Sequence, residues 1–272
     1  MMIETDSANL HILTEGVGSP ALVFLHYWGG TGRTWADVMG RLSHQCRCLA
    51  PDLPGWGGSS PSRHGYHIGH LAACIGAMID MLGLQDVVLV GHSMGGKIAQ
   101  YLAGQRPAWL RGLVLVASSP AVPMEVPAPQ RLAMQLAYAS RANVQETLDN
   151  VLTATPIRGT AREQVITDSL SGHRDAQIAW PTHGMLEDIS AMSLRIDVPT
   201  LLLTGELDRV DPLAVLAERL VPYLPDPEVH QIPSVGHLLP LEAPAEVASC
   251  IARWLDGDRT SARLRPNSVA SQ

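Results

Sequence analysis

Cysteine, basic residues and long apolar stretches are all scarce in this sequence of 272 residues. Four cysteines are too few to indicate a disulfide framework, so we expect reduced thiols. No stretch approaches the roughly 18 consecutive apolar residues that a membrane-spanning helix needs. Residues 1–6 also lack the basic segment and apolar core of a secretory signal. These absences predict a cytoplasmic protein that has no membrane partner.

Lysine and arginine number 19 against 26 aspartates and glutamates, which gives a formal net charge of −7 at pH 7. Because a negatively charged surface repels polyanions, we expect no nucleic-acid partner. Hydrophobic residues make up 46% of the chain, and its length suits one large α/β domain with a moderate insertion. The sequence leaves the oligomeric state open, and a homo-oligomer is compatible with it.

Short apolar runs alternate with amphipathic stretches through most of the chain. Such alternation is typical of a parallel sheet that is covered by helices on both faces. After a hairpin in residues 1–16, we expect buried strands near 21–26, 46–50, 86–90, 112–117, 199–204 and 228–232. Helices are expected near 33–43, 67–82, 94–106, 212–223 and 241–255. The sequence therefore predicts an α/β fold.

The alternation stops between Pro120 and Arg195, where the sequence indicates several helices instead. The clearest of these helices are expected in residues 128–141 and 143–154. The C-terminal residues are polar and show little apolar periodicity. Three parts are predicted: a core of residues 1–119 and 196–256, a helical cap of residues 120–195, and a disordered tail of residues 257–272.

The segment Gly91-His92-Ser93-Met94-Gly95 lies between an apolar run and a helical stretch. A serine on such a strand-turn-helix sits in a sterically poor backbone conformation, which glycines two residues before and after it permit. Its hydroxyl would stand at a helix N-terminus, where free N–H groups favour developing negative charge. Ser93 is therefore the candidate nucleophile, and the alternative is a glycine-rich turn without chemistry.

A serine nucleophile needs a general base, and the base needs a carboxylate that fixes its orientation. Asp208 follows the apolar run 198–204 and is the preferred acid, with Glu206 and Asp211 as the alternatives. His237 follows a short strand and precedes a C-terminal helix, which makes it the candidate base. The chain order of serine, acid and histidine is the one expected of α/β-hydrolases.

At this point the sequence resembles the α/β-hydrolase superfamily, in its cap-bearing branch of small esterases, lactonases and perhydrolases. Residues 21–30 resemble the family's strand and oxyanion loop, residues 52–59 its turn after the fourth strand, and residues 91–96 its nucleophile turn. The resemblance covers nearly the whole chain. It implies a mostly parallel sheet of about eight strands, helices on both faces, and a helical cap inserted after the sixth strand.

The resemblance also implies an activity and an oxyanion site. The backbone N–H groups of Trp28 and Met94 would stabilise the tetrahedral oxyanion while Ser93 forms an acyl-enzyme. The expected reaction is hydrolysis of a small, largely apolar carboxylic ester without a cofactor. Lactone opening, peracid formation and carbon–carbon bond hydrolysis on the same residues stay open, as does a non-enzymatic small-molecule receptor.

Candidate substrate-binding residues come from three regions of the sequence. Tyr27 stands where relatives usually have glycine, so its phenol would either line the pocket or pack against the cap. Met124 and Trp180 belong to the predicted cap, and Leu238 follows the candidate base. Methionines adapt to irregular apolar surfaces, which suits a pocket for an apolar acyl or alcohol group.

Three histidines, His64, His67 and His70, raise the question of a metal site. At helical offsets of three and six, the third histidine is turned away from the face of the first two. No carboxylate stands at a suitable spacing to help them. We therefore expect no metal site.

Overall fold

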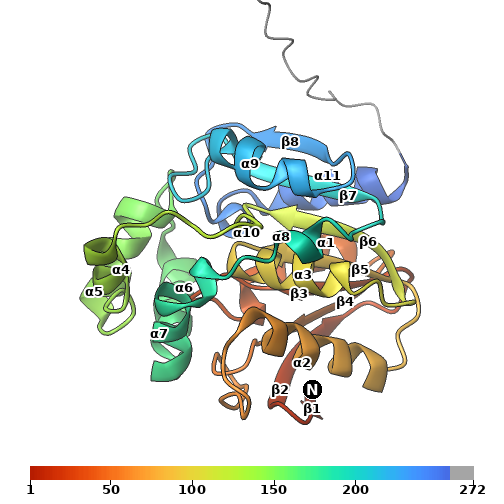
Figure 1. Cartoon of the computed structure of the whole chain (residues 1–272), viewed down its shortest axis with the longest axis horizontal. Coiled ribbons are helices and arrows are strands. Elements are labelled where there is room, and N and C mark those ends of the chain that lie inside the picture. Colours follow the sequence, from red (N-terminus) through yellow and green to blue (C-terminus); the bar gives the residue numbers. More distant parts are fainter. Residues whose placement is uncertain (258–272) are drawn as a thin grey trace, which may run out of the picture.

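The computed structural model describes residues 1–257, so the predicted tail lies, from residue 258 onward, outside the described residues. Figure 1 shows a single sheet with the strand order β1-β2-β4-β3-β5-β6-β7-β8. The strands are β1 (Met2–Glu4), β2 (Asn9–Glu15), β3 (Ala21–Leu25), β4 (Arg47–Pro51), β5 (Val87–His92), β6 (Leu110–Val116), β7 (Thr200–Gly205) and β8 (Glu228–Ile232). The β1–β2 and β2–β4 pairs are antiparallel, and all other pairs are parallel.

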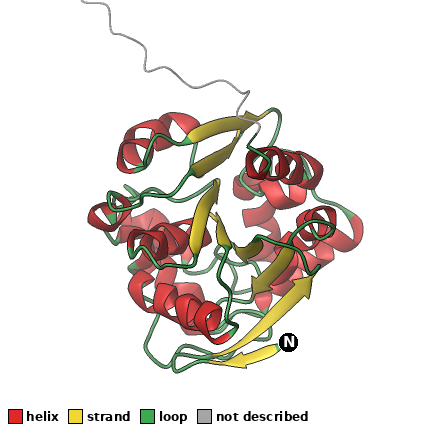
Figure 2. Ribbon diagram, turned by 90° about the vertical axis from the view of Figure 1, so that its right-hand side faces the viewer, coloured by secondary structure: helices red, strands yellow, loops and turns green. Residues whose placement is uncertain are grey.

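Helices cover both faces of this sheet, as Figure 2 shows. All residues of β3, β5 and β7 are buried, and their Val and Leu runs suit strands that face no solvent. The helices α2 (Ile68–Met81), α3 (Met94–Gly104) and α9 (Leu213–Arg219) pack on one face, and α1 (Ala36–Leu42) and α11 (Pro244–Leu255) on the other. The predicted fold class is confirmed. No helix among residues 1–257 is long and apolar enough to cross a bilayer.

Between β6 and β7 the chain leaves the sheet and forms a helical segment, green in Figure 1. We keep the name cap for its residues 120–195. The cap contains α4 (Ala128–Met134), α5 (Arg141–Thr147), the π-helical turn η2 (Leu148–Leu152), α6 (Gly159–Leu170), α7 (Arg174–Thr182), the 3-10 turn η3 (Gly184–Leu186) and α8 (Ser190–Ser193). It lies at one end of the sheet, beside the loops that carry the site described below.

The two clearest predicted cap helices end earlier in the chain than expected. The first ends at Met134, and a new helix begins after Ser140, whose side chain accepts the N–H of Asn143. The second ends at Leu152, whose carbonyl oxygen accepts the backbone N–H of His237 at 2.9 Å. A local cap and a long-range contact therefore set these boundaries, and apolar periodicity reports neither.

Three predicted core helices are each divided into two pieces. The N-terminal helix begins with a 3-10 turn, η1 (Gly32–Trp35). The other two are α9 followed by the 3-10 turn η4 (Val221–Tyr223), and α10 (Leu239–Glu242) followed by α11. Pro222 and Pro244 stand in the first turn of the second piece in these two cases. Proline has no N–H with which to continue a preceding helix.

Candidate active site

Ser93 lies on a tight turn between β5 and α3. Its φ of 52° is in the left-handed region, which costs a non-glycine residue about 1–3 kcal/mol. A Cβ on Gly91 would lie 2.5 Å from the carbonyl oxygen of Gly95, and a Cβ on Gly95 would lie 2.5 Å from that of Leu25. The two glycines therefore make room for the turn that places Ser93 at the N-terminus of α3.

His237 connects Ser93 with Asp208 through two hydrogen bonds. Its Nε2 lies 2.9 Å from Ser93 Oγ, and its Nδ1 lies 2.9 Å from Asp208 Oδ2. All three side chains are buried, and they follow β5, β7 and β8. The structure thus brings together the residues predicted as nucleophile, acid and base.

The geometry also separates Asp208 from the two alternative acids. Its Oδ1 accepts the backbone N–H groups of Val210 at 2.8 Å and Asp211 at 3.1 Å, which leaves Oδ2 for the imidazole. Glu206 instead accepts a backbone N–H of the loop after β8 at 2.8 Å. Asp211 is buried nearby but makes no hydrogen bond to His237. Asp208 is therefore the carboxylate that contacts the histidine.

The charges of this pair shift the two pKa values in opposite directions. Burial lowers the pKa of His237, but the Asp208 carboxylate, with a smaller contribution from Glu242, holds that pKa above its ordinary value. Burial raises the pKa of Asp208, but the imidazole and two backbone N–H groups hold it below its ordinary value. Asp208 therefore stays ionised and stabilises positive charge on the imidazole.

Two further titratable groups are buried close to the site. Burial raises the pKa of the Asp211 carboxyl group to about 8, against the opposing effect of His237. Burial also lowers the pKa of Lys97, on α3, to about 8, and its Nζ has no hydrogen-bond partner among the described residues. The Asp211 carboxyl group is therefore mostly protonated at neutral pH.

Two uncharged histidines hold the backbone around the site. The Nε2 atom of His92, the last residue of β5, lies 2.8 Å from the carbonyl oxygen of His237. In His26, after β3, Nδ1 lies 2.7 Å from the Tyr27 carbonyl oxygen and Nε2 accepts the Leu53 N–H at 2.9 Å. Burial lowers the pKa of His26 to about 4 and that of His92 to about 3. Both rings are therefore neutral near pH 7, and they position the backbone around the site through hydrogen bonds.

Trp28 and Met94 carry the predicted oxyanion donors. Met94 is the first residue of α3, and Trp28 lies in the loop after β3. No hydrogen bond between described residues uses the backbone N–H of either one. Both N–H groups are therefore available to an oxyanion.

Cap residues hold the loop that carries Trp28. The Tyr138 hydroxyl donates to the Trp28 carbonyl oxygen at 2.6 Å, and the Trp28 indole N–H donates to the Gln177 carbonyl oxygen at 3.0 Å. The Ser169 hydroxyl donates to the Gly29 carbonyl oxygen at 2.8 Å. Three cap positions thus fix two consecutive residues of the oxyanion loop.

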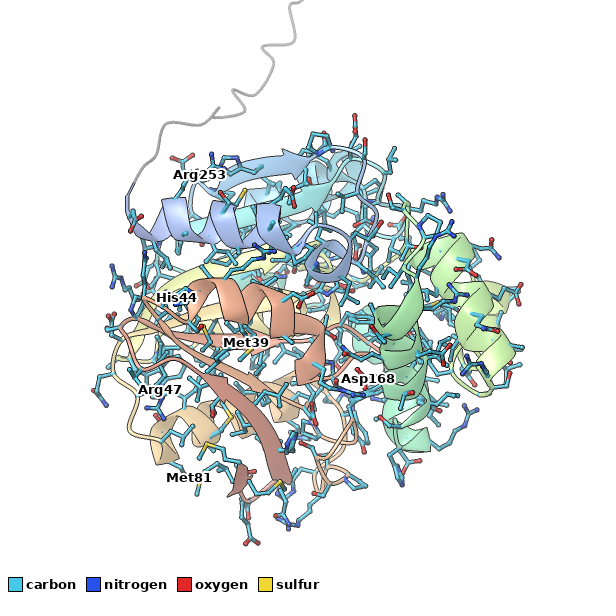
Figure 3. All side chains as sticks on the ribbon, turned by 180° about the vertical axis from the view of Figure 1, so that it is seen from behind. Met39, His44, Arg47, Met81, Asp168 and Arg253 are labelled. Carbon is cyan, nitrogen blue, oxygen red and sulfur yellow. The ribbon has the colours of Figure 1, made fainter. Side chains whose placement is uncertain are left out.

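An ion pair between a buried carboxylate and a half-exposed guanidinium extends this contact between cap and core. Asp168, labelled in Figure 3 where the cap meets the core, accepts the Thr31 hydroxyl at 3.0 Å and pairs with the Arg33 guanidinium. Burial raises the pKa of Asp168 above its ordinary value, although Arg33 and Thr31 oppose this shift. The loop after β3 is therefore joined to the cap by neutral and by charged contacts.

A cavity of about 500 Å³ between core and cap reaches Ser93 and His237. Three of the four predicted substrate-binding residues, Tyr27, Met124 and Trp180, line it. Leu238 does not: it is fully buried in a cluster with Leu148, Leu152 and Ile157. The prediction of Leu238 is therefore corrected, because the chain after His237 turns back into the protein.

The lining of this cavity is divided by chemical character. Four of the lining residues from α5 and η2 are polar, namely Asn143, Glu146, Thr147 and Asn150, while Val151 and Leu152 at the end of η2 are apolar. Segments 124–137 and 180–185 contribute mostly apolar side chains, among them Met124, Met134, Leu136, Trp180 and Met185. The cavity therefore offers an apolar region and a separate hydrogen-bonding region.

The three histidines considered for a metal site have separate partners or none. His64 Nε2 lies 2.9 Å from an Asp6 carboxylate oxygen, and His67 Nδ1 lies 3.2 Å from one of Glu187. Across residues 1–257, no three His, Cys, Asp or Glu side chains are grouped so that they could hold a metal ion.

Comparison with known proteins places this geometry in a family. The sequence profile of the alpha/beta hydrolase fold matches residues 20–158, just over half of the chain. The chain belongs to this family. A nucleophile turn within the matched range, together with the eight-stranded sheet, agrees with that membership.

Individual relatives of this α/β-hydrolase differ in their reactions. It is 31% identical over 252 residues to 2-succinyl-6-hydroxy-2,4-cyclohexadiene-1-carboxylate synthase of Enterobacter sp. (88% of this chain, 92% of the relative). It is 28% identical over 261 residues to the pimeloyl-[acyl-carrier protein] methyl ester esterase of Chromobacterium violaceum (91% and 98%). A solved membrane phospholipase A matches with a TM-score of 0.84 at 26% identity (96% and 86%). The family and its esterases support a hydrolase.

Glu242 is a residue of the α/β-hydrolase site that the sequence did not reveal. Its carboxylate accepts the backbone N–H groups of Ala154 at 2.9 Å, and of Gly236 and Leu238 at 3.2 Å each. It thereby joins the cap to both neighbours of His237. A glutamate in a short amphipathic helix resembles a surface residue, so only the tertiary contacts identify its role. The same holds for Tyr138.

Proposed function

We propose that this hydrolase cleaves a small, largely apolar carboxylic ester through an acyl-enzyme intermediate. The observation that carries the proposal is the pair of 2.9 Å contacts that His237 makes with Ser93 and Asp208. A hydroxyl, an imidazole and a carboxylate in this order are the arrangement that activates a serine for attack on a carbonyl carbon.

In the first half of the reaction, His237 accepts the hydroxyl proton as Ser93 Oγ attacks the ester carbonyl carbon. The Asp208 carboxylate holds the imidazole and stabilises its positive charge. The N–H groups of Trp28 and Met94 donate to the oxyanion, and each such donor is worth about a hundredfold to a thousandfold in turnover. His237 then gives its proton to the departing alcohol, which leaves an acyl group on Ser93.

In the second half, His237 removes a proton from water, which attacks the acyl-enzyme carbonyl carbon. The tetrahedral intermediate uses the same two N–H donors. Its collapse releases the carboxylic acid and returns the proton to Ser93 Oγ. No step requires a cofactor, since the protein supplies every proton carrier and every oxyanion donor.

The size and lining of the active-site cavity support a small, largely apolar acyl group. Its volume of about 500 Å³ is in the range of pockets for small molecules. Methionine and tryptophan side chains such as Met124, Met185 and Trp180 contribute apolar surface near the nucleophile. Burial of each methylene of an acyl chain against such surface is worth about 0.8 kcal/mol.

The experiment that tests this function removes the nucleophile. Ser93→Ala is expected to abolish both hydrolysis of p-nitrophenyl butyrate and labelling by a fluorophosphonate, while the far-UV circular dichroism stays that of the wild type. Ser249→Ala, a substitution at an exposed serine of α11, serves as the matched control and keeps both activities. Labelling that persists in Ser93→Ala would place the nucleophile elsewhere. Matched lactones in the same assay then test ring opening by the same residues.

A further inference from the structure

A second cavity, of about 400 Å³, lies between the cap and the loop after β7. Three arginines line it, Arg158 and Arg162 from the cap and Arg209 from the loop, together with one acidic residue, Asp149. The chain as a whole carries a net charge of −7, so the net positive charge of this cavity lining is opposite in sign to that of the whole protein. Guanidinium groups bind carboxylates and phosphates through paired N–H donors.

Two of these three guanidinium groups have no acidic partner among the described residues. Arg162 forms a two-point pair with Asp149, at 2.6 and 2.8 Å. Arg209 donates to the backbone carbonyl oxygen of Asn150 at 2.8 Å, which satisfies one N–H but neutralises no charge. The Arg158 side chain makes no hydrogen bond or ion pair within residues 1–257. The cavity therefore keeps two uncompensated positive charges.

Neighbouring carboxylates do not cancel this charge. Glu163, on α6, pairs with Arg141 at 2.5 Å, outside the cavity. Glu242 directs its oxygens at backbone N–H groups, including that of Thr155 at 3.0 Å. Glu146 lines the active-site cavity and not this one. An anion in the arginine-lined cavity would thus meet an attractive field that is screened by salt.

Arg209 lines both the active-site cavity and the arginine-lined cavity. It follows Asp208 in the chain and bonds to η2 through Asn150. The carbonyl oxygen of Leu152, the last residue of η2, accepts the N–H of His237 at 2.9 Å. Asp208, His237, η2 and Arg209 therefore lie on the same side of the active site.

The proposed mechanism assigns the two halves of an ester to different sides. His237 must reach the departing oxygen in order to protonate it, so the alcohol part lies on the side of η2 and Arg209. The acyl part then occupies the apolar region near Trp180 and Met185.

The geometry points to an anion subsite for the alcohol part of the substrate, formed by Arg209, Arg158 and Arg162. This inference rests on the proposed function and adds a substrate class to it. The substrate is an ester of an apolar acid with an alcohol that carries a carboxylate or a phosphate group. The oxygens of a planar carboxylate and those of a tetrahedral phosphate group can both accept hydrogen bonds from guanidinium N–H groups. The experiment distinguishes the two anions.

The test compares butyrate esters of four small alcohols: ethylene glycol, choline, glycolic acid and 2-phosphoethanol. We expect kcat/KM for at least one of the two anionic esters to exceed that of the neutral glycol ester by about tenfold, mainly through KM. The cationic choline ester should be the poorest. The advantage should shrink as NaCl rises from 20 to 500 mM, because salt screens the attraction. The better of the two anions identifies the group that the subsite takes.

Substitutions of the cavity arginines test whether these residues cause the preference for anionic esters. Arg158→Gln and Arg209→Gln should each reduce the ratio of anionic to neutral kcat/KM about fivefold, whereas Arg41→Gln, at an exposed arginine of α1, should leave the ratio unchanged. Equal kcat/KM for neutral and anionic esters, or a ratio that neither substitution lowers, would overturn the subsite while p-nitrophenyl butyrate still reports an active esterase. If no ester, including p-nitrophenyl butyrate, turned over, the proposed function itself would fail, and the subsite with it.

Discussion

The hydroxyl group of Tyr138 in the cap donates a 2.6 Å hydrogen bond to the carbonyl oxygen of Trp28 in the core. The two rings also pack together, with centroids 4.4 Å apart. The next residue, Gly29, has a φ of 97°, and a Cβ there would lie 2.3 Å from the Tyr138 ring. The cap therefore helps to determine where the proposed oxyanion donor of Trp28 points.

Tyr138→Phe tests this coupling between cap and oxyanion loop. The substitution keeps the ring but removes the donor to the Trp28 carbonyl oxygen. We expect kcat for p-nitrophenyl butyrate to fall about tenfold with little change in KM, because a displaced oxyanion donor weakens binding of the transition state more than of the substrate. Steady-state kinetics measure both constants. Tyr101→Phe, on α3, is the matched control and should leave both unchanged; a purely KM effect in Tyr138→Phe would argue against the coupling.

Asp208→Asn tests the assignment of the acid. The introduced carboxamide would keep an acceptor for the N–H groups of residues 210 and 211, but its NH₂ group would favour the wrong imidazole tautomer. A loss in kcat of about ten thousandfold is expected from the behaviour of serine triads. Glu206→Gln, the control at an alternative acid, should cost less than about twofold. A loss of only a few-fold in Asp208→Asn would mean that another carboxylate orients His237.

The sequence predicted the sheet and the three-residue constellation because both leave local signals. Apolar runs between turn residues mark buried strands such as β5 and β7, and a serine between Gly91 and Gly95 marks a strained turn. By contrast, the contacts of Tyr138 and Glu242 join segments far apart in the chain, with no periodicity or motif of their own. Leu238 follows the histidine directly in sequence, but it is fully buried and does not line the active-site cavity. The roles of these residues therefore depend on contacts between distant parts of the chain, which the sequence alone does not reveal.

The pH dependence of activity should follow His237. The base must be uncharged to accept a proton, so kcat/KM should rise with pH as the imidazolium deprotonates. Because Asp208 and Glu242 hold the His237 pKa above its ordinary value of 6.5, the midpoint of this rise should lie above pH 6.5. A rate profile from pH 4 to 9 measures the midpoint. A midpoint well below 6.5 would contradict the charge arrangement.

Glu242→Gln tests whether the glutamate acts on His237 by charge as well as by position. The change removes one of the carboxylates that raise the His237 pKa, so the midpoint of the kcat/KM profile should move to lower pH. It also weakens the contacts to Gly236 and Leu238, and the thermal midpoint should drop. Glu246→Gln, at an exposed position of α11, should change neither midpoint. A lower thermal midpoint with an unmoved pH profile would indicate a structural role only.

The buried Asp211 carboxyl group should make the folded state less stable as the solution becomes more alkaline. In the unfolded chain this group ionises near its ordinary pKa of 3.8, whereas burial raises the pKa to about 8 in the fold. Between these values the folded state binds more protons than the unfolded chain, so the free energy of unfolding decreases as pH rises. The contribution of the protonated Asp211 carboxyl group to the free energy of unfolding is fully present below pH 3.8 and is lost progressively up to pH 8. Its slope can reach about 1.4 kcal/mol per pH unit.

Asp211→Asn should remove this slope, because an amide of nearly the same shape does not ionise. Relative to the wild type, the variant should therefore gain about 1–3 kcal/mol of unfolding free energy between pH 5 and pH 8. Lys97 works in the opposite direction, since its positive charge favours the ionised carboxylate, and this limits the gain. Urea unfolding at pH 5, 6, 7 and 8 measures the difference, with Asp226→Asn at an exposed position as the control. A difference between Asp211→Asn and the wild type that stays constant with pH would show that Asp211 is already ionised in the folded protein.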